Sequence, residues 1–268
     1  KEVTLEFLDP SGKVVRKFTK RPDTAGQTVP EAGGFGGGGF GGGEPQVPAE
    51  AGLNSFVWNY RLPNAATVPG LIMWGGSLGG PRVSPGNYQV RLSVDGKAVA
   101  TESFMVKADP RLSTTPEDFA KQFDLMSKIN KKLTDTHNAI LDIRDARTQL
   151  ENLMRRLKPA ENKDLIDKAK DISKKLTDIE EALMQTKIKS GQDALNYPIR
   201  LNNKLAALSS SIDGSDDAPT TQAYDVYNDL VGQIDAQLGL FATVKTVDLA
   251  DFNKQFAAKG LPVIIPGR

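Results

Sequence analysis

The stretch that decides the fold runs from Thr115 to Leu157 and reads TPEDFAKQFDLMSKINKKLTDTHNAILDIRDARTQLENLMRRL. Its apolar residues recur every three or four positions, so they share one face of an α-helix. At about 1.5 Å per residue, that helix would be roughly 60 Å long. It cannot bury such a stripe alone, so later helices are expected to pack on it. The stripe consists of Phe119, Phe123, Met126, Ile129, Leu133, Ile140, Ile143, Leu150, Met154 and Leu157.

Caps and breaks divide the rest of residues 111–268 into further helices. Thr115 is placed to cap the long helix, with Pro116 in its first turn. Pro159 opens a second helix after a short connection, which predicts an antiparallel hairpin. Asp248 is expected to cap a last short helix, and an apolar tail at 261–265 is expected to dock on one of the domains. The intervening stripes are Leu165, Ala169, Ile172, Leu176, Ile179 and Leu183; Leu201, Leu205, Leu208 and Ile212; and Tyr224, Tyr227, Val231, Ile234, Leu238 and Phe241.

Residues 1–110 show strand patterns instead. Residues 3–19 alternate around the turn Asp9-Pro10-Ser11-Gly12 and predict a hairpin. Residues 53–60 alternate in the same way, and residues 88–94 and 99–106 flank a second turn, Asp95-Gly96. About seven short strands joined by Gly/Pro turns predict a small Ig-like β-sandwich. The expected fold is therefore α+β, a sandwich over 1–110 followed by an antiparallel bundle of four to five helices over 111–268.

A glycine-rich insertion interrupts the strands at residues 20–50. It contains GGFGGGGFGGG at positions 33–43. A dinucleotide-binding motif must lie between a strand and a helix, whereas proline and a strand pattern follow here, so a flexible insertion is expected. Phe35 and Phe40 within it are candidate interface residues.

Composition narrows the class of function. The 268 residues carry a net charge of +1, and neither part is basic enough to indicate a nucleic-acid partner. No apolar run is long enough to predict a membrane span, and the absence of cysteine rules out thiolate chemistry. The chain begins with Lys1 in a strand pattern, which favours a piece of a longer polypeptide or a processed form. No cofactor and no metal ion is expected.

The candidate reactive groups each have a simpler interpretation. His137, the single histidine, is expected to be at the helix surface or half-buried rather than a general base or metal ligand. The acidic loop around Asp213, Asp216 and Asp217 lacks a calcium-binding pattern and is expected to be a solvated turn. Acidic residues on the helices lie near lysines and are expected to form solvated ion pairs; these are Asp142, Asp145, Glu180 and Glu181.

Three aromatic residues are candidate binding residues. Trp58, Tyr60 and Trp74 would suit an aromatic platform for a sugar. They fit the sandwich core or a domain interface at least as well.

Several stretches resemble one family. GLNSFVWN at 52–59, PGLIMW at 69–74, SPGNYQVRL at 84–92, VKADPR at 106–111, LNYP at 195–198 and LNNKL at 201–205 are similar to the C-terminal region of bacterial BNR-repeat, sortilin-like β-propeller proteins. The resemblance implies an exported protein whose propeller lies upstream. The Phe-x-Trp and Pro-Gly-x-Tyr pattern also resembles the Ig-like domain of flagellar-hook-capping proteins. None of these motifs is a catalytic signature.

These patterns lead to three hypotheses of function. The first is a non-catalytic accessory, binding or assembly module at the C-terminal end of an exported propeller protein, whose partners are that propeller and a protein or glycan. The second is a contribution to a glycoside-acting enzyme whose active site lies in the propeller. The third is a structural subunit of a surface assembly. The expected location is the periplasm, the outer surface or the medium.

Overall fold

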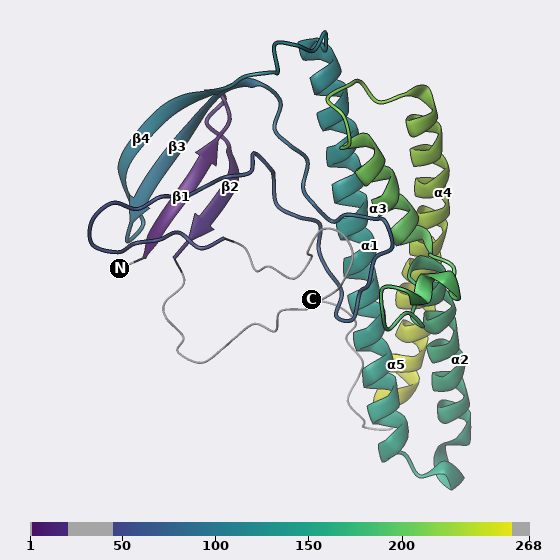
Figure 1. Ribbon diagram of the computed structural model, residues 1–268. Helices are drawn as coiled ribbons and strands as arrows, with labels where there is room; N and C mark the ends of the chain where they lie inside the picture. Colours follow the sequence, from purple (N-terminus) through teal and green to yellow (C-terminus); the bar gives the residue numbers. More distant parts are fainter. Residues whose placement is uncertain (1, 21–44, 259–268) are drawn as a thin grey trace. The chain divides into compact units, whose positions relative to one another are not determined.

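The computed structural model describes residues 2–20 and 45–258, and it combines an antiparallel β-sheet with α-helices (Figure 1). The chain is therefore of the mixed α+β class that the sequence predicts. It divides into two compact units, of which the first contains residues 1–64, 79–127 and 215–219 and the second contains 65–78, 128–214 and 220–268. The glycine tract with Phe35 and Phe40, and the apolar tail at 261–265, lie outside the described residues.

The sheet of the first unit has four antiparallel strands in the order β2-β1-β3-β4. Both predicted hairpins are confirmed. The Asp9 carboxylate accepts hydrogen bonds from the backbone N–H of Ser11 and Lys13, and Asp95 and Gly96 have the positive φ values, 48° and 75°, of a tight two-residue turn. The strands are β1 (Val3–Leu8), β2 (Val14–Thr19), β3 (Gly86–Val94) and β4 (Lys97–Val106).

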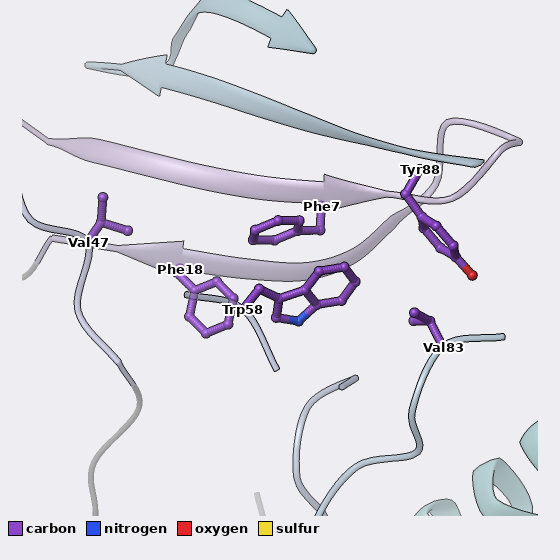
Figure 2. Packing of buried hydrophobic residues seen from close by; sticks show 6 residues of the cluster. All are labelled: Phe7, Phe18, Val47, Trp58, Val83 and Tyr88. Carbon is purple, nitrogen blue, oxygen red and sulfur yellow. The ribbon is translucent and has the colours of Figure 1, made fainter. Parts of the chain in front are cut away.

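One face of this sheet is buried by loop segments. Figure 2 shows Trp58 lying beneath the ring of Phe7 on β1, and the two rings stack with their centroids 4.2 Å apart. Aromatic contacts of this kind contribute about 0.5–1.5 kcal/mol beyond the area they bury. The buried cluster consists of Phe7, Phe18 and Tyr88 from the strands and Val47, Trp58 and Val83 from the loops.

The predicted strand over 53–60 is wrong. The only ladder contact near it is an isolated bridge between Arg61 and Arg82, and the described residues form four strands rather than about seven. The period-two pattern ends at Tyr60, which has a φ of +58° and is 50% exposed, whereas Trp58 is buried. Packing of Trp58 against the sheet accounts for the apolar alternation without any neighbouring strand.

The long helix is confirmed as α1 (Pro116–Arg156). Thr115 Oγ1 accepts from the Asp118 N–H at 3.2 Å, and the Thr115 N–H donates to the Asp118 carboxylate at 3.3 Å, which completes a reciprocal cap. The helix begins in the first compact unit and continues into the second from Lys128. Its face within the second unit is completely buried at Ile129, Ile140, Ile143, Ala146 and Leu150.

The predicted apolar stripes fit the later helices unequally, since on α4 (Thr221–Thr243) only Ile234 and Phe241 of the six predicted residues are buried. All six residues of the predicted stripe on α2 (Pro159–Leu183) are buried. The predicted cap at Asp248 is wrong, because α4 continues through the π-helical turn η2 (Val244–Asp248) into α5 (Leu249–Ala257) without a break. The Asp248 carboxylate instead pairs with Lys175 Nζ at 2.9 Å. The remaining elements are η1 (Asp193–Leu195) and α3 (Leu201–Ile212).

Candidate functional site

The candidate site is a pocket of about 180 Å³ within the first compact unit. The segment before β3, the segment after β4, the first turns of α1 and the loop at 215–219 all contribute to it. Its apolar part contains Val83, Val106 and Phe119. Its polar and aromatic side chains come from Tyr60, Arg82, Lys107, Asp109, Gln122 and Asp216.

Tyr60 is held in a conformation that tyrosine rarely adopts. Its φ of +58° is in the left-handed region, which costs an L-residue about 1–2 kcal/mol. The surrounding backbone fixes this turn, because the Tyr60 carbonyl accepts from the Val83 N–H at 2.8 Å and Leu62 N–H donates to Pro81 O at 3.0 Å. The Tyr60 ring lies 5.6 Å from that of Trp58, centroid to centroid. A strained aromatic residue that lines a pocket is a reason to examine that pocket for binding.

The loop at 215–219 is fixed to the pocket by its side chains and its backbone. Asp216 Oδ1 lies 3.0 Å from Arg82 Nη2. The Ser215 carbonyl accepts from Gln122 Nε2, and the Asp216 carbonyl accepts from Thr114 Oγ1, both at 2.6 Å. Asp216, which the sequence predicts to lie in a solvated turn, is therefore one half of an ion pair on the wall of the pocket.

The charges that line the pocket are balanced. Arg82 and Lys107 are cationic, and Asp109 and Asp216 are anionic. Hydrogen bonds from the Arg111 guanidinium and backbone N–H hold the pKa of Asp109 below its usual range, so this carboxyl is ionised at neutral pH. The pocket therefore presents strong donors and strong acceptors together, an arrangement suited to polar groups that both donate and accept.

The structure brings together two of the five predicted binding residues. Trp58 is buried in the sheet core with Nε1 donating to Arg61 O, and its neighbour Tyr60 reaches the pocket. Trp74 is 41% exposed and belongs to the second unit, where its backbone N–H and C=O both bond to the Asn203 side chain at 2.8 Å. Phe35 and Phe40 are outside the described residues.

Sequence reasoning missed the charged residues of the pocket. Arg82, Lys107 and Asp216 are far apart in the chain, and no motif joins them. The one local signal was that the alternating pattern ends with Tyr60, which is consistent with a strand end in the sequence and is a left-handed turn in the structure.

The second compact unit uses its polar groups to hold the segment 65–78. His137, predicted to be at the surface or half-buried, is completely buried. Its Nδ1 lies 2.5 Å from the Ala66 carbonyl and its Nε2 lies 3.1 Å from Asn202 Nδ2. Because Asn202 Oδ1 accepts from the Asn203 N–H, its amide nitrogen faces the imidazole. His137 is therefore neutral, with its proton on Nδ1.

Glu180, which was predicted to form a solvated ion pair, is only 3% exposed. Its two carboxylate oxygens accept from Arg144 Nε and from Arg147 Nη1, each at 2.6 Å. Arg144 Nη1 also donates to the Pro69 carbonyl at 2.8 Å. This buried group joins α2, α1 and the segment 65–78 within one unit.

We expect the stability of the chain to fall as the pH drops below about 6.5 because of His137. Burial lowers the pKa of His137, so below about 6.5, the pKa of an unfolded histidine, the unfolded chain binds a proton that the folded chain excludes. The free energy of unfolding should then fall by up to about 1.4 kcal/mol per pH unit. Urea denaturation at a series of pH values measures this slope.

The same prediction has a direct spectroscopic check. His137 is the single histidine of the chain, so one imidazole Hε1 signal reports it by NMR. That signal should not titrate above the pH at which the chain begins to unfold. A signal that titrates freely near pH 6.5 in the folded protein would contradict a buried neutral imidazole.

Among residues 2–20 and 45–258, no group of three or more His, Asp or Glu side chains is placed to hold a metal ion. No helix in this part of the chain has both the length and the apolar character needed to cross a membrane. Comparison with protein-family models, with curated proteins and with solved structures finds no match to the chain.

Proposed function

We propose that the chain is a non-catalytic binding module and that the pocket beside Tyr60 is its binding site. The observation that carries this proposal is the pairing of the charges in the pocket. Asp216 pairs with Arg82, and Asp109 is bonded by Arg111. A general acid or base needs a pKa near the working pH, whereas the hydrogen bonds from Arg111 hold the pKa of Asp109 below its usual range, which suits this carboxylate to accept hydrogen bonds.

The proposal extends to the context of the module. In it, residues 1–110 are an Ig-like sandwich, residues 111–268 are a helical bundle, and both terminate an exported BNR-repeat, sortilin-like β-propeller protein. Support comes from the stretches that carry the resemblance, since their residues have structural roles. Gly86 begins β3, Tyr88 is buried with its hydroxyl donating to Ser84 O, and Trp58 fills the core.

The test is a paired assay of turnover and binding. The purified chain should not hydrolyse chromogenic glycosides, peptides or esters, and it should bind at least one ligand class in a way that Tyr60→Asn weakens. Asparagine tolerates the left-handed backbone, so this variant removes the ring and keeps the turn. Robust turnover that maps to residues of this chain would overturn the proposal. The reading frame upstream of Lys1 tests the context, because propeller blades and an export signal are expected there.

A second candidate function has a specific observation in its favour. The segment 65–78 is fixed by Asn203, by His137 and by Arg144, and it keeps Trp74 41% exposed. A loop that is held in place by three side chains is suited to form one wall of an active site in a neighbouring domain. In this alternative, the chain shapes the active site of a glycoside-acting enzyme whose catalytic residues lie in the upstream propeller. Trp74→Ala in the full-length protein would then lower its turnover.

A further inference from the structure

We propose that the pocket beside Tyr60 binds one uncharged pyranose residue of a glycan. This inference depends on the proposed binding function and adds the chemical class of the ligand. It follows from three properties of the pocket, namely its size, its balanced polar lining and its half-exposed aromatic ring.

Size limits the ligand to one ring. Pockets for drug-sized ligands measure about 300–1,000 Å³, and this one measures about 180 Å³. It is too small for an oligosaccharide, a nucleotide or a helix, and it suits a single six-membered ring. The rest of a glycan chain would remain in solvent.

The polar lining matches hydroxyl groups. A sugar hydroxyl donates one hydrogen bond and accepts up to two, as serine and threonine hydroxyls do. Arg82 and Asp216 lie 3.0 Å apart, so neighbouring hydroxyls of one ring can accept from the guanidinium and donate to the carboxylate.

The balance of charge argues against an ionic ligand. A phosphate or a carboxylate would meet Asp109 and Asp216, and a cationic side chain would meet Arg82 and Lys107. An anionic or a cationic ligand would therefore make both attractive and repulsive charge interactions in this pocket. A neutral ligand keeps the Arg82–Asp216 pair intact.

The aromatic ring supplies the apolar part of the contact. One face of a pyranose carries mostly C–H groups, and an aromatic ring with a polar end packs against such a face. Tyr60 is 50% exposed, its backbone carbonyl accepts the hydrogen bond from the Val83 N–H, and its ring contacts that of Trp58. A turn whose backbone is ordered before binding loses little backbone entropy when the ligand binds.

The experiment is an NMR titration of the full chain, labelled with ¹⁵N, against methyl β-glucopyranoside, methyl β-galactopyranoside and methyl α-mannopyranoside. At least one should shift the backbone amides of Tyr60, Arg82 and Lys107, with a Kd on the order of 1 mM for so small a ligand. Tyr60→Asn and Tyr60→Gly, which both suit a positive φ, should each raise that Kd at least tenfold. Tyr197→Ala is the matched control, since it removes a ring that is 39% exposed in the other unit and does not line the pocket, and it should leave the Kd unchanged.

The other outcomes separate this inference from the proposed function. Sorbitol has the hydroxyls but no ring, and equal shifts with sorbitol would overturn the pyranose assignment. Shifts at the same amides with inorganic phosphate or N-acetyl-argininamide, and none with the three glycosides, would also overturn it while leaving a binding module in place. Hydrolysis of a nitrophenyl glycoside at this pocket would keep the ligand class and overturn the non-catalytic function.

Discussion

Replacing Gly80 by alanine is expected to lower the free energy of unfolding by at least about 3 kcal/mol, the upper range for overpacking a tight site. A Cβ at this position would lie 2.1 Å from the Leu62 carbonyl oxygen and 2.5 Å from that of Pro63. Both atoms belong to the backbone, so no side-chain rotation relieves the clash. Residues 62–63 and residues 80–81 would have to move apart, and the hydrogen bond from the Leu62 N–H to the Pro81 carbonyl would be lost.

The matched control is the same substitution at Gly232. This glycine is exposed on α4 and has nothing within 4 Å of an added Cβ. Gly232→Ala should therefore stabilise the chain by about 0.5–1 kcal/mol, because alanine restricts the unfolded chain more than glycine does. Urea denaturation followed by circular dichroism measures both. Equal effects at the two positions would mean that residues 62 and 80 are not in contact in solution.

Glu180→Ala is the second substitution with a large expected effect. It leaves Arg144 and Arg147 without the carboxylate that each contacts at 2.6 Å. Breaking a buried pair on one side costs about 3–5 kcal/mol. The arginine side chains are 32% and 29% exposed, so they partly regain water, and the lower end, about 3 kcal/mol, is expected.

Glu181→Ala controls for the loss of a glutamate from the same turn of α2, since Glu181 is exposed. It should change stability by less than about 0.5 kcal/mol. Glu180→Gln keeps a hydrogen-bond acceptor for one arginine, so its loss of stability should lie between those of Glu180→Ala and Glu181→Ala. Hydrogen exchange adds a local readout, because Arg144 also bonds to Pro69 O, and the amides of 65–78 should lose protection in Glu180→Ala. A Glu180→Ala chain as stable as Glu181→Ala would show that the three charges do not form a buried group.

The helices were predictable because their signals are local. The α1 stripe repeats over 41 residues, and its start is marked by a threonine, a proline and two acids within four positions. The two hairpin turns were predictable for the same reason, since Asp95-Gly96 specifies its own backbone geometry. The π-helical turn η2 was not, because nothing near Asp248 distinguishes a cap from a residue inside a continuous helix.

The errors in the first 110 residues have a different origin. The alternation of Phe56, Trp58 and Tyr60 indicates an extended segment with one side buried. Both a strand and an extended loop produce that pattern. Only the hydrogen-bonding partner separates them. For this segment the partner is residues 80–83, a stretch without strand composition.

The buried polar groups were missed because burial depends on what covers a residue. His137 and Glu180 occupy helix positions that read as surface, and the segment 65–78 supplies the Ala66 and Pro69 carbonyls that accompany their burial. The pocket could not be predicted from the sequence for a similar reason. Tyr60 and Asp216 are 156 positions apart, and no sequence pattern links the two segments.

The anchoring of residues 65–78 also sets an order of events during translation. Trp74 bonds to Asn203, a residue 129 positions later in the chain. At about 5–20 residues added per second, the ribosome takes roughly 6 to 26 seconds to reach that partner. Throughout this interval the nascent segment has neither Asn203 nor the Ala206 carbonyl that Ser77 contacts. Chaperones and proteases therefore encounter this segment before its permanent neighbours exist.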